Sequence, residues 1–272
     1  MALILPLCIL AAIVILFLIG KIGLSRQFDK EVKELFAMSK DRSAVPFSYD
    51  SISALPAPVQ RYFKHVLKEG QPSISSVRLR HDGQFKPSMK SGWVDIQGEQ
   101  YFTADPPGFV WKGKTPLFTA RDMYLSGKGK IVVSLLSLVT ILRGEGPNYD
   151  QGELLRWLGE SAWFPTNLLP GRHLKWAPID DRTAELSFNY NGLSLSYIVR
   201  FSENDEIAEV ETQRYMGEEN LETWIGRFFD YAEVEGVIIP TRIEAVWMLE
   251  EGEHSYARFN VQEIEFDKRE KY

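Results

Sequence analysis

The sequence predicts a mainly β protein of the α+β class, with a large curved antiparallel sheet or half-barrel, a few packed helices and an N-terminal transmembrane helix. Three observations lead to this fold class. Residues 2–20 carry no charged side chain. Between residues 77 and 266, most segments alternate polar and apolar residues and are bounded by Gly, Pro or Asp. Among them, Asn191-Gly192 is a pair that readily forms a tight β-hairpin turn.

The uncharged segment at residues 2–20 is rich in Leu, Ile, Val and Ala. At about 1.5 Å of rise per residue, a helix of this length nearly crosses a hydrocarbon core of roughly 30 Å. A cleaved signal peptide would need basic residues before the apolar run and a small-x-small motif after it, and the sequence has neither. We therefore expect a single-pass cell-membrane protein with an uncleaved anchor at residues 1–24.

A basic flank and an amphipathic pattern follow the anchor. The basic residues are Lys21, Arg26, Lys30 and Lys33, and the positive-inside rule would keep this flank in the cytoplasm. The apolar residues Phe28, Val32, Leu35 and Phe36 have helical spacing. Residues 25–50 are therefore expected to form an amphipathic stalk or linker.

Residues 51–272 are expected to form a single antiparallel β domain. Ser53 can cap a short helix that has Pro56 and Pro58 near its first turn and ends before Gly70. The strand-like segments are 77–82, 93–102, 109–112, 121–126, 174–178, 184–190, 193–201, 207–215, 223–233, 237–249 and 254–266. Such a series of neighbouring strands favours a curved sheet over a doubly wound fold.

Two segments interrupt the strands. Residues 130–142 are almost continuously apolar and are expected to form a buried strand or a core helix, because they are too short for a second membrane crossing. Residues 151–163 have helical spacing through three leucines and Trp157.

Composition and motifs exclude several functions. The formal net charge of −6 disfavours binding to nucleic acid. The single cysteine, Cys8, lies within the apolar run, so the body has no thiol chemistry. The four histidines are scattered, and no phosphate-binding loop or nucleophile elbow is present. We therefore predict neither a metal site nor a cofactor.

The segment 153–165 holds the densest group of polar and aromatic side chains. Glu153, Arg156 and Glu160 are spaced by three and four residues and can share one helix face, with Trp157 and Trp163 nearby. They could line a pocket in which burial raises a carboxyl pKa. The simpler interpretation is an ion pair on a helix whose tryptophans enter the core.

A second candidate lies on the strand at 121–126, where Asp122 and Tyr124 share one side. Asp122 could be a polar group inside a cavity, or it could belong to a turn or the surface. Seven tryptophans could line an apolar concavity or simply fill the core. The candidate ligand-binding residues are Asp122, Tyr124, Arg156, Trp157, Glu160 and Trp163.

Several motifs in order resemble a bacterial family of unknown function whose members carry an N-terminal membrane anchor. They are LPAPVQRYF at 55–63, PGFVW at 107–111, RDMY at 121–124, ELLRWLGESAWFP at 153–165 and the segment 230–241. This resemblance implies no activity. The strand series is also distantly similar to the half-barrels of LolA-type lipoprotein carriers and mycobacterial lipid-binding lipoproteins. That similarity implies an apolar concave face for acyl chains and a body outside the cytoplasm, opposite to the side that the basic flank indicates.

The leading functional hypothesis is a membrane-anchored binding module that holds a lipid or another hydrophobic ligand in the concave face of the sheet. A hydrolase-like enzyme using Glu160 or Asp122 in the same cavity is one alternative, and a non-catalytic envelope scaffold is another. A water-reachable pair of carboxyls would favour the enzyme, and a sealed ion pair between Glu160 and Arg156 would count against it.

Overall fold

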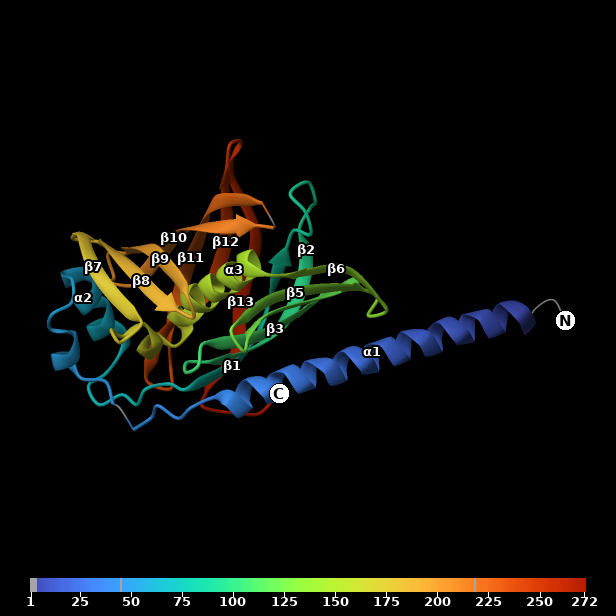
Figure 1. Ribbon diagram of the computed structural model, residues 1–272, viewed down its shortest axis with the longest axis horizontal. Helices are drawn as coiled ribbons and strands as arrows, with labels where there is room; N and C mark the ends of the chain where they lie inside the picture. The colour runs from blue at the N-terminus through green and yellow to red at the C-terminus, as the bar shows by residue number, and fades with distance from the viewer. Residues whose placement is uncertain (1–3, 45, 218) are drawn as a thin grey trace.

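The structure is a computed structural model that describes residues 4–44, 46–217 and 219–272, with side chains of the N-terminal helix described from residue 14 onward. Its described part contains a sheet of 13 strands in the order β6-β5-β4-β3-β2-β1-β13-β12-β11-β10-β9-β8-β7. The sheet is curved and open, with β6 and β7 at its edges (Figure 1). The predicted curved antiparallel sheet is confirmed.

The chain builds the sheet from the middle to one edge and then from the other edge back to the middle. The outward strands are β1 (Ser76–Phe85), β2 (Val94–Thr103), β3 (Gly108–Lys114), β4 (Phe118–Leu125), β5 (Lys128–Leu135) and β6 (Val139–Glu145). The returning strands are β7 (Leu174–Asp180), β8 (Thr183–Tyr190), β9 (Leu193–Phe201), β10 (Ile207–Met216), β11 (Asn220–Val234), β12 (Val237–Leu249) and β13 (Gly252–Phe266). Antiparallel pairing of β13 with β1 joins the two halves.

The predicted hairpin at Asn191-Gly192 is confirmed as the connection between β8 and β9. Both residues have positive φ angles, 50° and 80°. Two successive positive φ angles are what a type I′ turn needs, and Asn and Gly adopt them with least strain.

Helix α3 (Pro147–Gly159) crosses between the two halves of the sheet and lies within its curve (Figure 1). It contacts β5 and β10, and its leucines 154, 155 and 158 are buried in the main core. The short helices η2 (Glu160–Trp163) and η3 (Pro165–Leu168) continue the crossing. The helical pattern predicted for residues 151–163 is therefore confirmed.

At the end of the sheet near β7, η1 (Tyr49–Ile52) and α2 (Ala57–Val66) add a small helical layer. Helix α2 contacts β8 and β12 and buries Val59, Tyr62, Phe63 and Val66, which recur at helical spacing. The predicted helix is thereby confirmed, but Ser53 does not cap it, because the helix begins at Ala57 with Pro56 as its N-cap and Ser53 is the C-cap of η1 instead.

The N-terminal helix α1 (Ile4–Met38) packs its second half on the outer face of the sheet and extends its first half away from it (Figure 1). Phe28, Val32, Leu35 and Phe36 form a small core with side chains of β2, β3 and β4. The amphipathic part of α1 is therefore packed onto the domain from Phe28 to Phe36, and the helix ends at Met38.

Among the described residues, no helix combines the length and the apolar character that a membrane crossing needs. Much of the anchor predicted at residues 1–24 lies outside this description, because residues 1–3 and the side chains of residues 4–13 are not part of it.

The apolar segment 130–142 is neither a buried strand nor a core helix. It forms the end of β5, a turn at Leu136-Ser137 and the start of β6. Because β6 is an edge strand that no helix covers on its outer part, most of its side chains are exposed. The expectation of a buried segment is therefore wrong, because an apolar run can also form an exposed edge hairpin.

Candidate functional site

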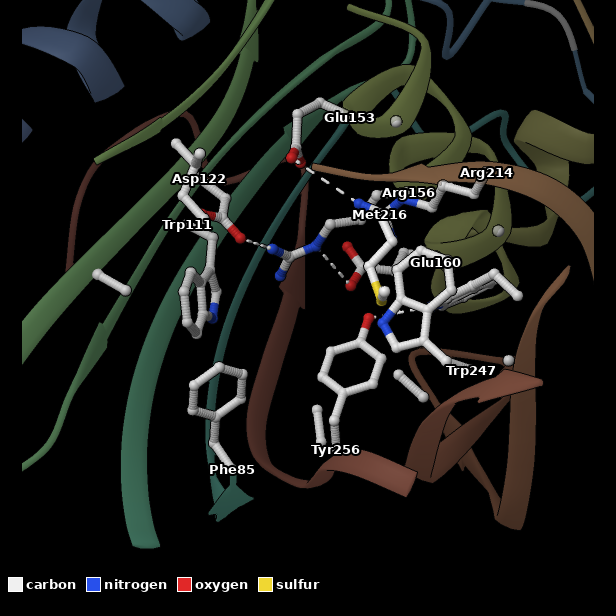
Figure 2. A pocket seen from close by; sticks show the side chains of 18 of the residues that line it. Phe85, Trp111, Asp122, Glu153, Arg156, Glu160, Arg214, Met216, Trp247 and Tyr256 are labelled. Carbon is white, nitrogen blue, oxygen red and sulfur yellow. Dashed lines mark hydrogen bonds and ion pairs between the residues drawn. The ribbon is translucent and has the colours of Figure 1, made fainter. Parts of the chain in front are cut away.

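A cavity of about 500 Å³ lies between the concave face of the sheet and α3. Residues of β1 to β6 line one side, and residues of β10 to β13 line the other. Its walls are largely apolar, and their aromatic side chains include Phe118, Trp224, Phe228 and Phe259. Phe85, Trp111, Trp247 and Tyr256 also line it (Figure 2). Its volume is within the range of about 300–1,000 Å³ that is usual for small-molecule sites.

Charged side chains gather on the α3 side of this cavity. Figure 2 shows Glu153 and Arg156 of α3 and Glu160, the first residue of η2, close to Asp122 of β4 and Arg214 of β10. The helical spacing of three and four places Glu153, Arg156 and Glu160 on one face, as predicted. We call these five residues the charged cluster.

Arg156 is the centre of the charged cluster. Its Nη1 donates to Oδ2 of Asp122 at 2.6 Å, and its Nε donates to Oε1 of Glu160 at 3.0 Å. Its guanidinium carbon also lies 4.9 Å from the ring centre of Trp111, within cation–π range. Gln100 of β2 donates to the other oxygen of Glu160 at 2.6 Å. Both Arg156 and Glu160 are therefore held by several neighbours.

Glu153 and Arg214 form a looser pair at the same end, with Oε1 and Nη2 separated by 3.8 Å. Desolvation raises the pKa of Glu153 to about 8, and repulsion from Asp122 adds to this shift, while Arg214 and Arg156 oppose it. Glu153 is consequently mostly protonated at neutral pH.

The other two carboxyls follow the same trend. Desolvation raises the pKa of Asp122 and of Glu160, and the positive charge of Arg156 opposes the shift in both cases. The charged cluster thus combines three carboxyls with two arginines, and the ion pairs of Arg156 with Asp122 and Glu160 favour the ionised form of these two carboxyls.

Two carboxyl oxygens of the charged cluster have no hydrogen-bond partner among the described residues although they are buried. They are Oδ1 of Asp122 and Oε2 of Glu153. A buried polar atom without a partner is unfavourable, so these atoms mark places where a bound molecule could form a hydrogen bond: it could donate to Oδ1 of Asp122 and accept from Oε2 of protonated Glu153.

The structure brings together half of the ligand-binding residues named from the sequence. Asp122, Arg156 and Glu160 line the cavity. Trp157 and Trp163 are instead buried in the core, where their indole nitrogens donate to the carbonyl oxygens of Thr103 and Pro240. Tyr124 is fully buried as well, and it is not among the residues that line the cavity.

Sequence reasoning missed the contribution of β10 to β13. Arg214 was not named, although it occupies an inward position of β10 in register with Val210 and Thr212. A charged residue at an inward position of a strand was the available signal. Trp247 and Tyr256 gave no such signal, because aromatic residues on strands usually belong to the core.

His81 stacks on Trp111 and Phe259, two aromatic residues that line the cavity. Its Nε2 accepts a hydrogen bond from Nε1 of Trp111 at 2.8 Å, and burial lowers its pKa to about 4. His81 is therefore neutral and helps to fix the Trp111 indole. In the part of the chain that the structure describes, no group of three His, Cys, Asp or Glu side chains could hold a metal ion.

Several solved structures resemble this chain at low sequence identity. A domain named as an outer membrane lipoprotein-sorting protein, from Vibrio parahaemolyticus, has a TM-score of 0.41 and 10% identity, covering 78% of this chain and 91% of its own. A LolA superfamily protein from Nitrosomonas europaea has a TM-score of 0.37 and 14% identity, covering 78% and 94%. A DUF1329 family protein from Desulfovibrio piger has a TM-score of 0.36 and 11% identity, covering 84% and 95%.

Comparisons of the sequence itself give one result. No curated protein matches the chain. The model of a family of unknown function, DUF6544, matches residues 45–259, which is most of the chain. That match confirms the resemblance to a family of unknown function that the motifs indicated, and the chain belongs to this family.

Proposed function

We propose that the protein binds a hydrophobic ligand in the cavity between α3 and the concave face of the sheet. The observation that carries this proposal is a cavity of about 500 Å³ with largely apolar walls and one buried charged cluster. Burial of apolar ligand surface would supply most of the affinity, at about 25 cal/mol per Å². The charged cluster would fix the orientation of the polar end.

The chemistry of the charged cluster favours an uncharged polar end with hydroxyl groups. A phosphate or carboxylate would lie beside the acidic side chains of Asp122 and Glu160. Arg156 already forms ion pairs with both of them, and Arg214 lies nearby, so the arginines balance these two charges and leave no positive charge for an anionic ligand. A hydroxyl can donate to Oδ1 of Asp122 and accept from Oε2 of protonated Glu153, two atoms that have no partner among the described residues. A monoacylglycerol is the simplest molecule that combines such a head with an apolar chain.

Native mass spectrometry of the full-length protein, released from detergent micelles, tests this proposal. We expect a co-purifying lipid at a fixed ratio, and displacement of a fluorescent monoacylglycerol by the unlabelled compound. Ala245→Trp should block binding because Ala245 lines the cavity. Ala232→Trp is the matched control, since Ala232 is exposed on β11.

Binding that is equal in the two tryptophan variants would contradict the cavity as the site. Tighter binding of a free fatty acid than of the monoacylglycerol would retain the cavity and overturn the proposed polar end.

The hydrolase-like alternative has weaker support. Both oxygens of Glu160 already accept hydrogen bonds, from Arg156 and Gln100, and Asp122 shares Arg156 with it. A general acid or base needs a carboxyl that can reach the proton it transfers. The envelope-scaffold alternative predicts a concave face filled by the protein's own side chains, and the cavity speaks against it.

The proposal includes attachment to the membrane through residues 1–24. Its support is the uncharged run at residues 2–20. The protein should stay with the membrane after alkaline extraction of cells that express it, and release into the extract would contradict the anchor. A Ser194→Cys variant in a Cys8→Ala background, treated with a membrane-impermeant maleimide in intact cells, assigns the side of the body, because Ser194 is exposed.

A further inference from the structure

The large exposed apolar side chains are concentrated in one region. Among the described residues, 13 of the 16 lie either in α1 between residues 14 and 22 or in the segment 117–142. The second group is Leu117, Leu135, Leu136, Leu138, Val139, Ile141 and Leu142, which we call the tip surface. Exposed apolar patches of this kind mark contacts with another molecule or a membrane.

The tip surface adjoins α1 where the uncharged run ends. A methyl group placed at Gly20 would lie 2.5 Å from the carbonyl oxygen of Ser137 and 2.7 Å from Cδ2 of Leu138. Phe17 and Leu24 line a groove together with Leu117 and Leu136. Figure 1 shows the β5–β6 hairpin extending alongside α1. The apolar face of α1 and the tip surface therefore form one continuous region.

The turn at the end of the hairpin does not use the usual turn residues. Leu136 and Ser137 have φ angles of 49° and 59°, a conformation that Asn and Gly adopt with least strain. An apolar side chain at the outermost point of a hairpin is unfavourable in water. Leu136 at this position is therefore consistent with a hairpin turn that contacts an apolar phase.

Basic side chains border this region. Lys21 and Lys114 lie in the same groove, and Arg143 is exposed on β6. None of the three has an ion-pair partner among the described residues, whereas the whole chain carries a net charge of −6. Unpaired basic residues beside an apolar patch are complementary to anionic phospholipid headgroups.

The tip surface also continues into the cavity. Ile141 and Leu142 belong to both, since they are exposed and line the cavity, and Phe118 follows Leu117 into it. An apolar chain could thus pass from the tip surface to the cavity without leaving apolar surroundings.

We propose that the tip surface docks on a phospholipid bilayer containing anionic lipid, beside the membrane anchor, so that the cavity faces the membrane at Ile141 and Leu142. Docking follows from the tip surface, α1 and the basic border. Movement of a ligand from the bilayer into the cavity rests, in addition, on the proposed function.

Fluorescence of a probe on the full-length protein tests the docking. Leu138→Cys and Leu221→Cys are made in a Cys8→Ala background, labelled with an environment-sensitive dye and reconstituted in vesicles of phosphatidylcholine and phosphatidylglycerol. Leu221 is the matched control, because it is an exposed leucine outside the tip surface. We expect a blue-shifted emission at position 138 that nitroxide-labelled lipids quench, and neither effect at position 221.

Each result decides a separate point. A protein that floats with the vesicles while both probes remain accessible to aqueous iodide would refute the docking and leave the anchor. A blue shift at position 138 that grows with protein concentration and resists nitroxide lipids would refute it in favour of a second copy of the chain. Failure of the protein to float with the vesicles would refute both the anchor and the docking. Loss of lipid binding in Ala245→Trp while docking is retained would test only the proposed binding of a ligand in the cavity.

Discussion

Glu153 is the residue whose ionisation should most affect stability. Its folded-state pKa is raised to about 8, chiefly by desolvation, from an ordinary value of 4.5. A raised carboxyl pKa gives stability that is present below the unfolded-state pKa and is lost as the pH rises through the folded-state value. Each pH unit between the two values corresponds to about 1.4 kcal/mol.

We therefore predict that Glu153→Gln removes part of the pH dependence of unfolding. Between pH 5 and pH 8.5, the wild-type protein should lose on the order of 2–4 kcal/mol of unfolding free energy relative to the variant. Urea unfolding of both proteins across this pH range measures the difference. A constant difference between them would show that Glu153 ionises normally.

Arg156 should be the residue of the charged cluster that is most costly to remove alone. Arg156→Met leaves Asp122 and Glu160 buried without their shared positive partner. Breaking a buried ion pair in this way typically lowers the unfolding free energy by roughly 3–5 kcal/mol.

The matched control for Arg156→Met adds Asp122→Asn and Glu160→Gln, which remove both negative charges. This triple variant should recover most of the lost stability in urea unfolding at pH 7. If it is no more stable than the single variant, packing of Arg156 on Trp111 matters more than its charge.

At the scale of elements, the attachment of α3 to β5 decides the shape of the cavity. Oδ1 of Asp150, in the first turn of α3, accepts a hydrogen bond from the backbone nitrogen of Gly129 at 2.7 Å. A Cβ at Gly129 would lie 2.1 Å from the carbonyl oxygen of Tyr149. Only glycine allows α3 to approach β5 so closely.

Gly129→Ala is therefore expected to push α3 away from β5 and to lower the unfolding free energy by about 1–3 kcal/mol, the usual range for overpacking. Faster hydrogen exchange in α3 should accompany the loss. Gly171→Ala is the control, because no atom lies within 4 Å of its added Cβ, and it should change stability by less than about 0.5 kcal/mol. Equal effects of the two substitutions would contradict this account of α3 docking.

The same elements show how far the sequence could predict the structure. The strands from β8 to β13 follow from alternation and from turn residues such as Asn191-Gly192, since both signals are local. Strands β5 and β6 did not follow, because an apolar run is compatible with a buried strand, a core helix or, as here, an exposed hairpin.

The candidate site was predictable to the extent that it depends on one helix. Helical spacing brings Glu153, Arg156 and Glu160 together, and the strand pattern gives Asp122 its inward direction. The position of Arg214 beside Glu153 depends on where β10 lies in the sheet relative to α3. Only the strand order shows this, because β4 and β10 lie in different halves of the sheet.

At the scale of the whole molecule, the second half of α1 belongs to the body. Phe28, Val32, Leu35 and Phe36 are buried against the outer face of β2, β3 and β4. Glu31 also pairs with the buried Arg121 of β4. The family match begins at residue 45 and therefore leaves this layer out.

A chain that starts at residue 45 should consequently be less stable than one that starts at residue 25. Full burial of one such side chain contributes about 1.5–3 kcal/mol, so loss of the layer should lower the unfolding free energy by roughly 5 kcal/mol or more. It would also expose Tyr101, Val110 and Met123, which should promote aggregation. Urea unfolding and light scattering of the two chains measure both effects. Phe28→Ala in the longer chain should give an intermediate stability. Equal stability of the two truncated chains would instead show that the second half of α1 does not contribute to the stability of the domain.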